Sequence, residues 1–241
     1  MNKNPIKVIT FDLDDTLWEV QPVLMRAENL VYQWLQQHAP KVSEKFTIKS
    51  FMQWRWDIYK QNAELTHQMT QLRLVAVAAA MREVGYDAEQ SQHLSEQAFA
   101  VFIKARHDIT FFDQAIPLLE QLHQHYTLGA LSNGNADIFQ LEAAPYFDFS
   151  FSAEQLNASK PDPAQFNAAA QQAKVEMHEI IHIGDNLEHD IEGAQQAGCH
   201  SIWFNPKNLT APNHIQPSQQ VTSLAEIPAA IQAIAHAAAI K

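Results

Sequence analysis

The sequence predicts an α/β fold, with a doubly wound parallel sheet as its core and an inserted all-α helical segment. Short apolar runs alternate with helical segments in the second half of the chain, which is the pattern of βαβ units. One further apolar run, residues 6–11, precedes a long stretch of helical periodicity with few glycines. We therefore expect a core of residues 1–18 and 109–241 and a helical domain of residues 19–108.

The expected strands finish in polar residues. Residues 6–11 run into "DLDDT", residues 127–131 into "SNGN", and residues 180–183 into "GDNLEHD". Residues 147–151 and 199–204 are two more expected strands, and residues 116–125 and 190–197 are expected helices. Ligands bind outside the carboxyl ends of the strands in open parallel sheets, so we expect the three polar segments to form one site.

The composition narrows the class of protein. The chain has 241 residues, 46% of them hydrophobic, and a formal net charge of −11. The negative charge argues against nucleic-acid binding and against an anionic membrane surface. The single cysteine suits a reducing compartment, and no apolar run approaches the length of a membrane span. These observations predict a cytoplasmic globular protein, and they specify no oligomeric state.

The segment "DLDDT" crowds acidic side chains together. Asp12 and Asp14 are two positions apart, so an extended backbone directs both to the same side, whereas Asp15 is expected to point away. Thr16 is expected to hold the turn by a hydrogen bond. With Asp185, these carboxylates would make an oxygen-rich negative pocket whose natural guest is Mg²⁺.

Further polar residues turn this metal site into a phosphate site. Ser132, Asn133 and Gly134 end a strand, where a hydroxyl and backbone N–H groups can face an anion. Lys160 stands before a proline and offers a positive charge to a phosphate oxygen. Asp190 follows Asp185 by five positions and adds a fourth carboxylate to the pocket.

Together, "DLDDT", "LSNG", Lys160 and "GDNLEHD" resemble, in order, the four motifs of the haloacid dehalogenase superfamily. The resemblance spans the chain and implies a Rossmann-like core with an α-helical cap, acting as a Mg²⁺-dependent phosphatase on a small phosphorylated molecule. It implies that Asp12 is the nucleophile, that Asp14 is the general acid and base, and that the phosphoryl group is bound by the later motifs. Those phosphate-binding residues are Ser132, Asn133, Gly134 and Lys160.

The resemblance also implies a ligand set for the metal. Asp12, the backbone carbonyl of Asp14, and Asp185 would bind Mg²⁺. Three residues would support the site: Asp190, Asn186 and Thr16.

Within the superfamily, four segments look like those of the bacterial phosphatases that act on 5-amino-6-(5-phosphoribitylamino)uracil. They are "TFDLDDTLW", "SNGNA", "GDNLEHDIEGAQQAG" and "HQMTQLR". A related sugar or nucleotide-like monophosphate is the expected substrate class. On a helix through "ELTHQMTQLRL", Leu65, Met69, Leu72 and Ala76 would face inward, and Arg73 and His67 would lie largely off that stripe. These two polar residues are candidates for substrate specificity, and an ordinary solvated helix face is the alternative.

Three other functions fit the same motifs. A phosphosugar mutase would use the same core chemistry, and a 2-haloacid dehalogenase would use the aspartate nucleophile without a metal. Asp14 speaks against the dehalogenase, because a halide leaving group needs no proton. A catalytically inactive binding module is the third alternative, and the intact set of Asp12, Asp14, Lys160 and Asp185 speaks against it.

Overall fold

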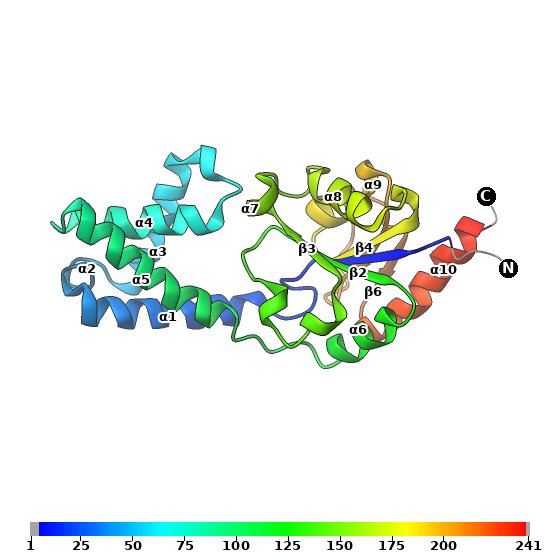
Figure 1. Cartoon of the computed structure of the whole chain (residues 1–241), viewed down its shortest axis with the longest axis horizontal. Helices are drawn as coiled ribbons and strands as arrows, with labels where there is room; N and C mark the ends of the chain where they lie inside the picture. The colour runs from blue at the N-terminus through cyan, green and yellow to red at the C-terminus, as the bar shows by residue number, and fades with distance from the viewer. Residues whose placement is uncertain (1–4, 240–241) are drawn as a thin grey trace. The chain divides into compact units, whose positions relative to one another are not determined.

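The computed structural model describes residues 5–239 and divides the chain into two compact units (Figure 1). One unit combines Met1–Glu19 with Thr110–Lys241, and the other is Val20–Ile109. Both boundaries lie one residue beyond those expected from the sequence. The first unit is called the core unit below, and the second is called the helical unit.

A parallel sheet forms the centre of the core unit. Within the described residues its order is β3-β2-β1-β4-β5-β6, and all neighbouring strands are parallel. This arrangement confirms the predicted α/β fold. The strands are β1 (Val8–Phe11), β2 (Thr127–Ser132), β3 (Phe149–Ser152), β4 (Ile180–Gly184), β5 (His200–Phe204) and β6 (Gln219–Val221).

Only β6 was not expected from the sequence. Two of its three residues are exposed, so this edge strand has no apolar run that would indicate it. In contrast, β1 and β4 are buried along their whole length, as strands covered on both faces are. They lie side by side with Phe11 opposite Ile183, so the residues that follow both strands emerge together at one edge.

Helices cover both faces of the sheet, as Figure 1 shows for α8 and α9 on one side and α6 and α10 on the other. Helix α8 packs on β2 and β3, and α10 packs on β5 and β6. The helices are α6 (Ala115–His123), α7 (Ala153–Leu156), α8 (Ala164–Ala173), α9 (Gly193–Ala197) and α10 (Ile227–Ala239). Short 3₁₀ turns occupy Ile138–Gln140, Ala144–Tyr146, Met177–Glu179 and Leu224–Glu226.

The helical unit has its own apolar core, built around Leu35, Phe51, Met81 and Phe102. Its helices are α1 (Val20–His38), α2 (Pro40–Lys45), α3 (Ile48–Gln61), α4 (Met69–Glu83) and α5 (Ala88–Arg106), with a 3₁₀ turn at Ala63–Leu65.

Side-chain caps set two of the helix starts. Thr47 accepts a hydrogen bond from the Ser50 N–H at the start of α3, and Asp87 accepts one from the Gln90 N–H at the start of α5. Each cap satisfies a backbone donor that the first helical turn leaves without an intrahelical partner. Within the described part of the chain, no helix combines the length and apolarity that a membrane span requires.

Candidate active site

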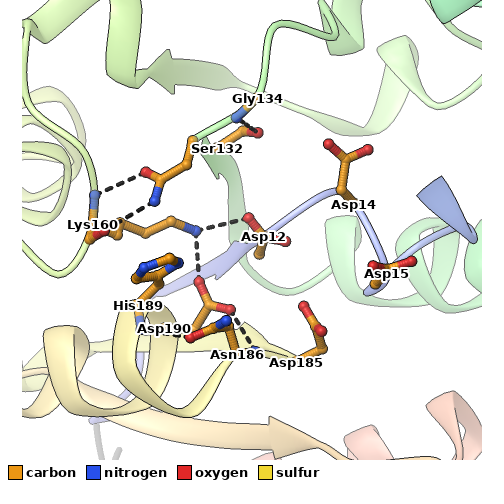
Figure 2. Close-up of a pocket in the computed structure, with 11 residues that line it drawn as sticks. Asp12, Asp14, Asp15, Ser132, Gly134, Lys160, Asp185, Asn186, His189 and Asp190 are labelled. Carbon is orange, nitrogen blue, oxygen red and sulfur yellow. Dashed lines mark hydrogen bonds and ion pairs between the residues drawn. The ribbon is translucent and has the colours of Figure 1, made fainter. Parts of the chain in front are cut away.

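Three strand ends meet in one pocket of the core unit. Asp12 follows β1, Asp185 follows β4, and Ser132 ends β2. The strands that follow β1 lie first on one side of it, as β2 and β3, and then on its other side, as β4, β5 and β6. The boundary between β1 and β4 is therefore the topological switch point of the sheet, where α/β proteins bind their ligands. The pocket has a volume of about 180 Å³ and is lined by Asp12, Asp14, Asp15, Ser132, Asn133, Gly134, Lys160, Asp185, Asn186, His189 and Asp190 (Figure 2).

Nine of these residues were candidates from the sequence, and Asp15 and His189 were not. Asp15 was expected to point away from the site, but it has a φ of 59°, which takes it out of the alternation of an extended strand. His189 lies inside the segment "GDNLEHD". Its position next to Asp190 is the sequence feature that could have identified it as a pocket residue. Thr16 does not line the pocket, and its hydroxyl donates to Asp185 at 3.5 Å.

Lys160 is the positive centre of the site. Its side chain is 1% exposed, and its ammonium donates to Asp12 Oδ1 at 2.8 Å and to Asp190 Oδ1 at 2.7 Å. It also donates to the carbonyl of Leu131 at 2.5 Å. One ammonium therefore lies between two carboxylates, one directly after β1 and the other in the segment that follows β4, and it fixes the position of both (Figure 2).

The backbone of Lys160 is held just as firmly. The Asn133 side-chain amide donates to the Lys160 carbonyl at 2.9 Å, and the Asn133 side-chain oxygen accepts from the Lys160 N–H at 2.8 Å. The sequence suggested that Asn133 faces the phosphate, whereas in the structure its side chain positions the lysine loop.

Gly134 also differs from the expectation of N–H groups open to an anion. Its N–H donates to the Ser132 hydroxyl at 3.0 Å, so a phosphate oxygen would have to replace that hydroxyl as the acceptor. The Ser132 hydroxyl can donate its own proton to a phosphate oxygen in either case, because a hydroxyl accepts and donates at the same time.

Asp190 is buried and fully engaged. Besides Lys160, its Oδ1 lies 3.2 Å from His182 Nε2, and its Oδ2 accepts from the Asn186 N–H at 2.9 Å. His182 in turn contacts the Thr10 hydroxyl through Nδ1 at 2.9 Å, so both ring nitrogens of this strand histidine have partners within the core. Burial lowers the pKa of His182 to about 4, with the Lys160 charge adding to the effect, so the imidazole is neutral near pH 7.

A glycine and a π-helical turn allow Asp190 to come this close. A Cβ built on Gly184 would lie 2.3 Å from Asp190 Cγ, so only glycine fits before Asp185. Asp190 belongs to the π-helical turn Leu187–Glu192, and the Asn186 side chain caps this turn by accepting from the N–H groups of Glu188 and His189. The spacing of the "GDNLEHD" segment therefore reflects a local fold that brings its two aspartates together.

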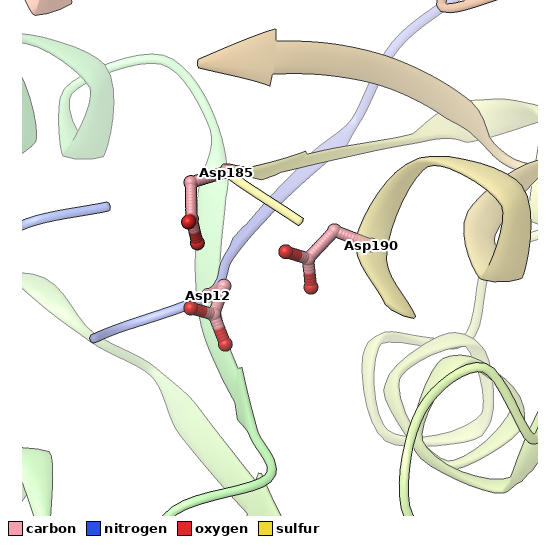
Figure 3. Close-up of side chains that lie close together, drawn as sticks. All are labelled: Asp12, Asp185 and Asp190. Atoms are coloured by element: carbon pink, nitrogen blue, oxygen red, sulfur yellow. The ribbon is translucent and has the colours of Figure 1, made fainter. Parts of the chain in front are cut away.

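The carboxylates of Asp12, Asp185 and Asp190 offer oxygen atoms that all lie within 4.8 Å of one another (Figure 3). Oxygen ligands suit a hard cation such as Mg²⁺. Asp190 had been predicted as a supporting residue, and its place in this cluster is compatible with that role because both its oxygens already accept hydrogen bonds within the protein. Trp203 Nε1 fixes the backbone beside the cluster by donating to the Asp185 carbonyl at 2.8 Å.

The electrostatics of the cluster fit a cation. Burial raises the pKa of Asp185 to about 7, and the negative charges of Asp190 and Asp15 add to the rise. Burial likewise raises the pKa of Asp12 well above its usual value, against the opposing effect of the Lys160 ammonium. Burial also acts to raise the pKa of Asp190, but there the Lys160 charge and the hydrogen bonds with His182 and Lys160 together outweigh it, and the net shift is downward. Lys160 alone therefore does not keep all of these carboxylates ionised, and a bound cation would favour their charged forms.

Asp14 contacts a buried indole. Trp18 Nε1 donates to Asp14 Oδ1 at 2.8 Å, and the Trp18 side chain is 0% exposed. In Figure 2, Asp12 lies between Lys160 on one side and Asp14 on the other. The sequence did not identify Trp18 as a site residue, because a large aromatic residue after an acidic turn is usually interpreted as part of the hydrophobic core.

The two specificity candidates lie in the helical unit, where Arg73 differs from the expectation. Its side chain is buried, its guanidinium pairs with Glu28 at 2.9 Å, and it lies over the Phe102 ring at 3.4 Å from the centroid. Helix α4 begins only at Met69, so His67 precedes the helix. The helical periodicity that placed His67 near Arg73 on one face therefore does not apply to it. Met69, expected on the inward stripe, is 37% exposed.

Comparisons with known proteins agree with this site. The haloacid dehalogenase-like hydrolase family model matches residues 6–198. The 5-amino-6-(5-phospho-D-ribitylamino)uracil phosphatase YigB of Escherichia coli is 30% identical over 226 residues, which cover 92% of this chain and 94% of that protein.

Two solved structures share the fold. The structure of 2-haloacid dehalogenase from Pseudomonas syringae pv. Tomato DC3000 has a TM-score of 0.89 and 36% identity, and the match covers 95% of this chain and 99% of that one. The magnesium-bound HAD-hydrolase YfnB of Bacillus subtilis has a TM-score of 0.63 and 21% identity, and the match covers 94% and 98%. The chain thus belongs to the haloacid dehalogenase-like hydrolase family, in which it is a phosphatase, that is, a phosphoric monoester hydrolase.

Proposed function

We propose that this phosphatase uses Mg²⁺ and hydrolyses a small phosphorylated metabolite through an aspartyl phosphate on Asp12. The observation that carries the proposal is the single pocket in which Lys160 joins Asp12 to Asp190 and which Asp14 and Asp185 also line. A nucleophile, an acid and base, a fixed cation and a cluster of oxygen ligands are the parts that phosphoryl transfer requires.

The chain's own residues account for both halves of the reaction. An Asp12 oxygen attacks phosphorus, the bond from phosphorus to the ester oxygen breaks, and the leaving alkoxide takes a proton from Asp14. Asp14 then takes a proton from water as the water oxygen attacks phosphorus. The bond between phosphorus and Asp12 breaks, which restores the carboxylate and releases inorganic phosphate.

The remaining residues of the site position the nucleophile and neutralise the charge of the phosphoryl group. Lys160 keeps Asp12 in place and offsets the negative charge of the phosphoryl group. Ser132 and the Gly134 N–H would donate to its oxygens. Mg²⁺ would be held by Asp12, the Asp14 carbonyl and Asp185, and when bound it supplies charge neutralisation at the phosphoryl oxygens.

The helical domain expected at residues 19–108 would serve as the cap that selects substrates, and residues 1–18 and 109–241 would carry the chemistry. The relationship to YigB supports 5-amino-6-(5-phospho-D-ribitylamino)uracil, or a related sugar or nucleotide-like monophosphate, as the substrate. The 36% identical structure described as a 2-haloacid dehalogenase keeps that activity as the second candidate. Asp14 favours the phosphatase, because an alkoxide must be protonated to leave and a halide need not be.

The test is an assay of the purified protein against a panel of phosphorylated metabolites, with p-nitrophenyl phosphate as a general substrate and EDTA as the metal-free control. We expect release of inorganic phosphate that EDTA abolishes and Mg²⁺ restores. Halide release from a 2-haloacid in EDTA would overturn the proposal in favour of the dehalogenase. An isomerised sugar phosphate in place of free phosphate would overturn it in favour of a mutase.

A further inference from the structure

Among the described residues, Trp18 is the one tryptophan whose indole N–H donates a hydrogen bond to an acidic side chain of the pocket. Its Nε1–H donates to Asp14 Oδ1 at 2.8 Å across four positions of the chain. An indole N–H can only donate, so it presents Asp14 with a fixed donor and no acceptor.

The local fold holds this contact in place. After Asp14 the chain turns back on itself, with Asp15 at a φ of 59° and the Asp15 N–H donating to the Trp18 carbonyl at 2.7 Å. The Leu17 N–H donates to the Leu13 carbonyl at 2.9 Å, which closes the turn a second time. The backbone between the indole and the carboxylate is therefore a short closed loop.

The ring itself has little freedom. Trp18 is 0% exposed, and Phe111 packs edge-on against it with ring centroids 5.3 Å apart and an interplanar angle of 89°. The backbones of Trp18 and Phe111 also form an antiparallel bridge. A donor on a packed ring keeps its direction when the pocket fills, unlike a donor on an exposed side chain.

We infer that Trp18 is a positioning residue for proton transfer, which holds the Asp14 carboxyl group by Oδ1 in the orientation in which it gives and takes the proton. The inference rests on the acid and base role proposed for Asp14. In the first half-reaction the proton of the Asp14 carboxyl group passes to the leaving alkoxide, whose oxygen keeps the electron pair of the broken P–O bond. In the second half-reaction the Asp14 carboxylate takes a proton from the attacking water, and the starting state is restored.

The test is the dependence of Trp18→Phe on the leaving group. An alkyl phosphate needs its leaving oxygen protonated, whereas p-nitrophenol leaves with little protonation. We compare kcat/KM, which covers only the steps up to phosphorylation of Asp12, because the second half-reaction is the same for both substrates. We expect kcat/KM for the alkyl phosphate to fall about 10- to 50-fold, which is the loss typical for one hydrogen bond to a charged group, and kcat/KM for p-nitrophenyl phosphate to fall less than about threefold. Inhibition by inorganic phosphate should stay within about twofold because it reports phosphate binding. Equal losses on both substrates would overturn the inference.

Phenylalanine also removes volume, so a second replacement isolates the donor. Incorporation of β-(3-benzothienyl)alanine at position 18 keeps the bicyclic ring and replaces N–H with sulfur. The same leaving-group dependence is expected, and wild-type kcat/KM for the alkyl phosphate would overturn the inference even if Trp18→Phe fails to fold.

Trp203→Phe is the matched control. It removes a buried indole N–H at the same pocket, but that donor binds the backbone carbonyl of Asp185 and not Asp14. We expect its losses to be equal for the two substrates. A leaving-group dependence as large as that of Trp18→Phe would contradict a role specific to Trp18.

A double substitution separates this inference from the proposed function. Trp18 acts through Asp14, so Trp18→Phe should cause no further loss in the Asp14→Asn background, and a full additional loss would overturn the inference. If Asp14→Asn itself slows both substrates equally, the acid role proposed for Asp14 fails. If Asp14→Asn shows the leaving-group dependence and Trp18→Phe does not, only the inference about Trp18 fails.

Discussion

Each of the two units contains a buried charge cluster, and the two clusters are opposite in sign. In the core unit one cation, Lys160, lies between two anions, Asp12 and Asp190. In the helical unit one anion, Glu28, lies between two cations, Arg55 and Arg73. Neither cluster is balanced by its own members.

Their surroundings differ. The excess positive charge of the helical unit faces aromatic rings, since Arg55 lies over Phe51 at 5.8 Å and Arg73 lies over Phe102 at 3.4 Å from the ring centroids. The excess negative charge of the core unit faces a pocket, and Asp185 adds to it there. The charge of the helical-unit cluster thus faces groups of the protein itself, whereas the core-unit cluster faces a pocket with room for a cation and a phosphate.

The comparison shows how to interpret buried charge. Burial and imbalance are common to both clusters, so neither property identifies a site. The distinguishing property is where the uncompensated charge points, which is into a pocket in the core unit and onto aromatic faces in the helical unit. The comparison predicts that substitutions in the core cluster change activity and that those in the helical cluster change stability.

The largest effect is expected for Asp12→Asn. An amide cannot accept the phosphoryl group, so kcat should fall at least about 10⁴-fold. The melting temperature of the metal-free protein should stay near that of wild type, because burial disfavours the Asp12 carboxylate and Lys160 keeps its ion pair with Asp190. Assay and thermal denaturation measure the two quantities, and Asp113→Asn, at an exposed position of the core unit, is the control. Substantial remaining activity would break the comparison.

Next in size is Glu28→Gln, which leaves two buried arginines without a counter-charge. We expect it to destabilise the protein by about 3–5 kcal/mol, as the loss of one partner of a buried ion pair does. The control is Glu83→Gln, whose pair with Lys45 is exposed and should contribute only about 0–1 kcal/mol. Denaturant unfolding measures both, and similar losses in the two variants would contradict the distinction.

Asp185→Asn should act on metal binding. Loss of a carboxylate ligand should raise the Mg²⁺ concentration for half-maximal activity roughly tenfold or more. Calorimetric titration of the protein with Mg²⁺, without substrate, should show the same shift. Unchanged Mg²⁺ affinity in that titration would remove Asp185 from the site.

The smallest effect concerns the pH dependence of stability in the metal-free protein. It tests whether the pKa shifts in the two clusters have opposite directions. Burial raises the pKa of Asp185 to about 7, so its contribution to stability is lost as the pH rises toward and through 7. Burial opposes ionisation of Glu28 as well, but Arg73 and Arg55 outweigh it and lower the pKa of Glu28, so its contribution is lost only as the pH falls below about 4.5.

The melting temperature in EDTA should therefore be highest near pH 4.5 and should fall from there as the pH rises toward 7. Every kcal/mol corresponds to roughly 2–4 °C in a chain of this size. Glu28→Gln should reduce the fall at acidic pH, and Asp185→Asn should reduce the fall toward neutral pH. A melting temperature that rises steadily from pH 5 to pH 8 in wild type would contradict the assignment to Asp185.

Specific residues show how far the sequence leads. Asp12, Lys160 and Asp185 were found from the sequence because each directly follows or precedes a strong local signal, a buried strand or a proline. Parallel strands bring such positions to one edge whatever the detailed packing. Arg73 could not be placed in this way, because its partner Glu28 is 45 positions away and the start of α4 at Met69 changes its phase.

The sequence by itself determined the α/β fold, the order of the strand-end motifs and the chemistry that these side chains can perform, since hydrophobic periodicity and residue type are local properties. Only the tertiary structure decided the partners: that Trp18 holds Asp14, that Asn133 holds the backbone of Lys160, and that Arg73 is buried against Glu28. The physical reason is that periodicity fixes the face of an element on which a side chain lies. The atom that a side chain meets depends on where the other elements pack, which no local pattern encodes.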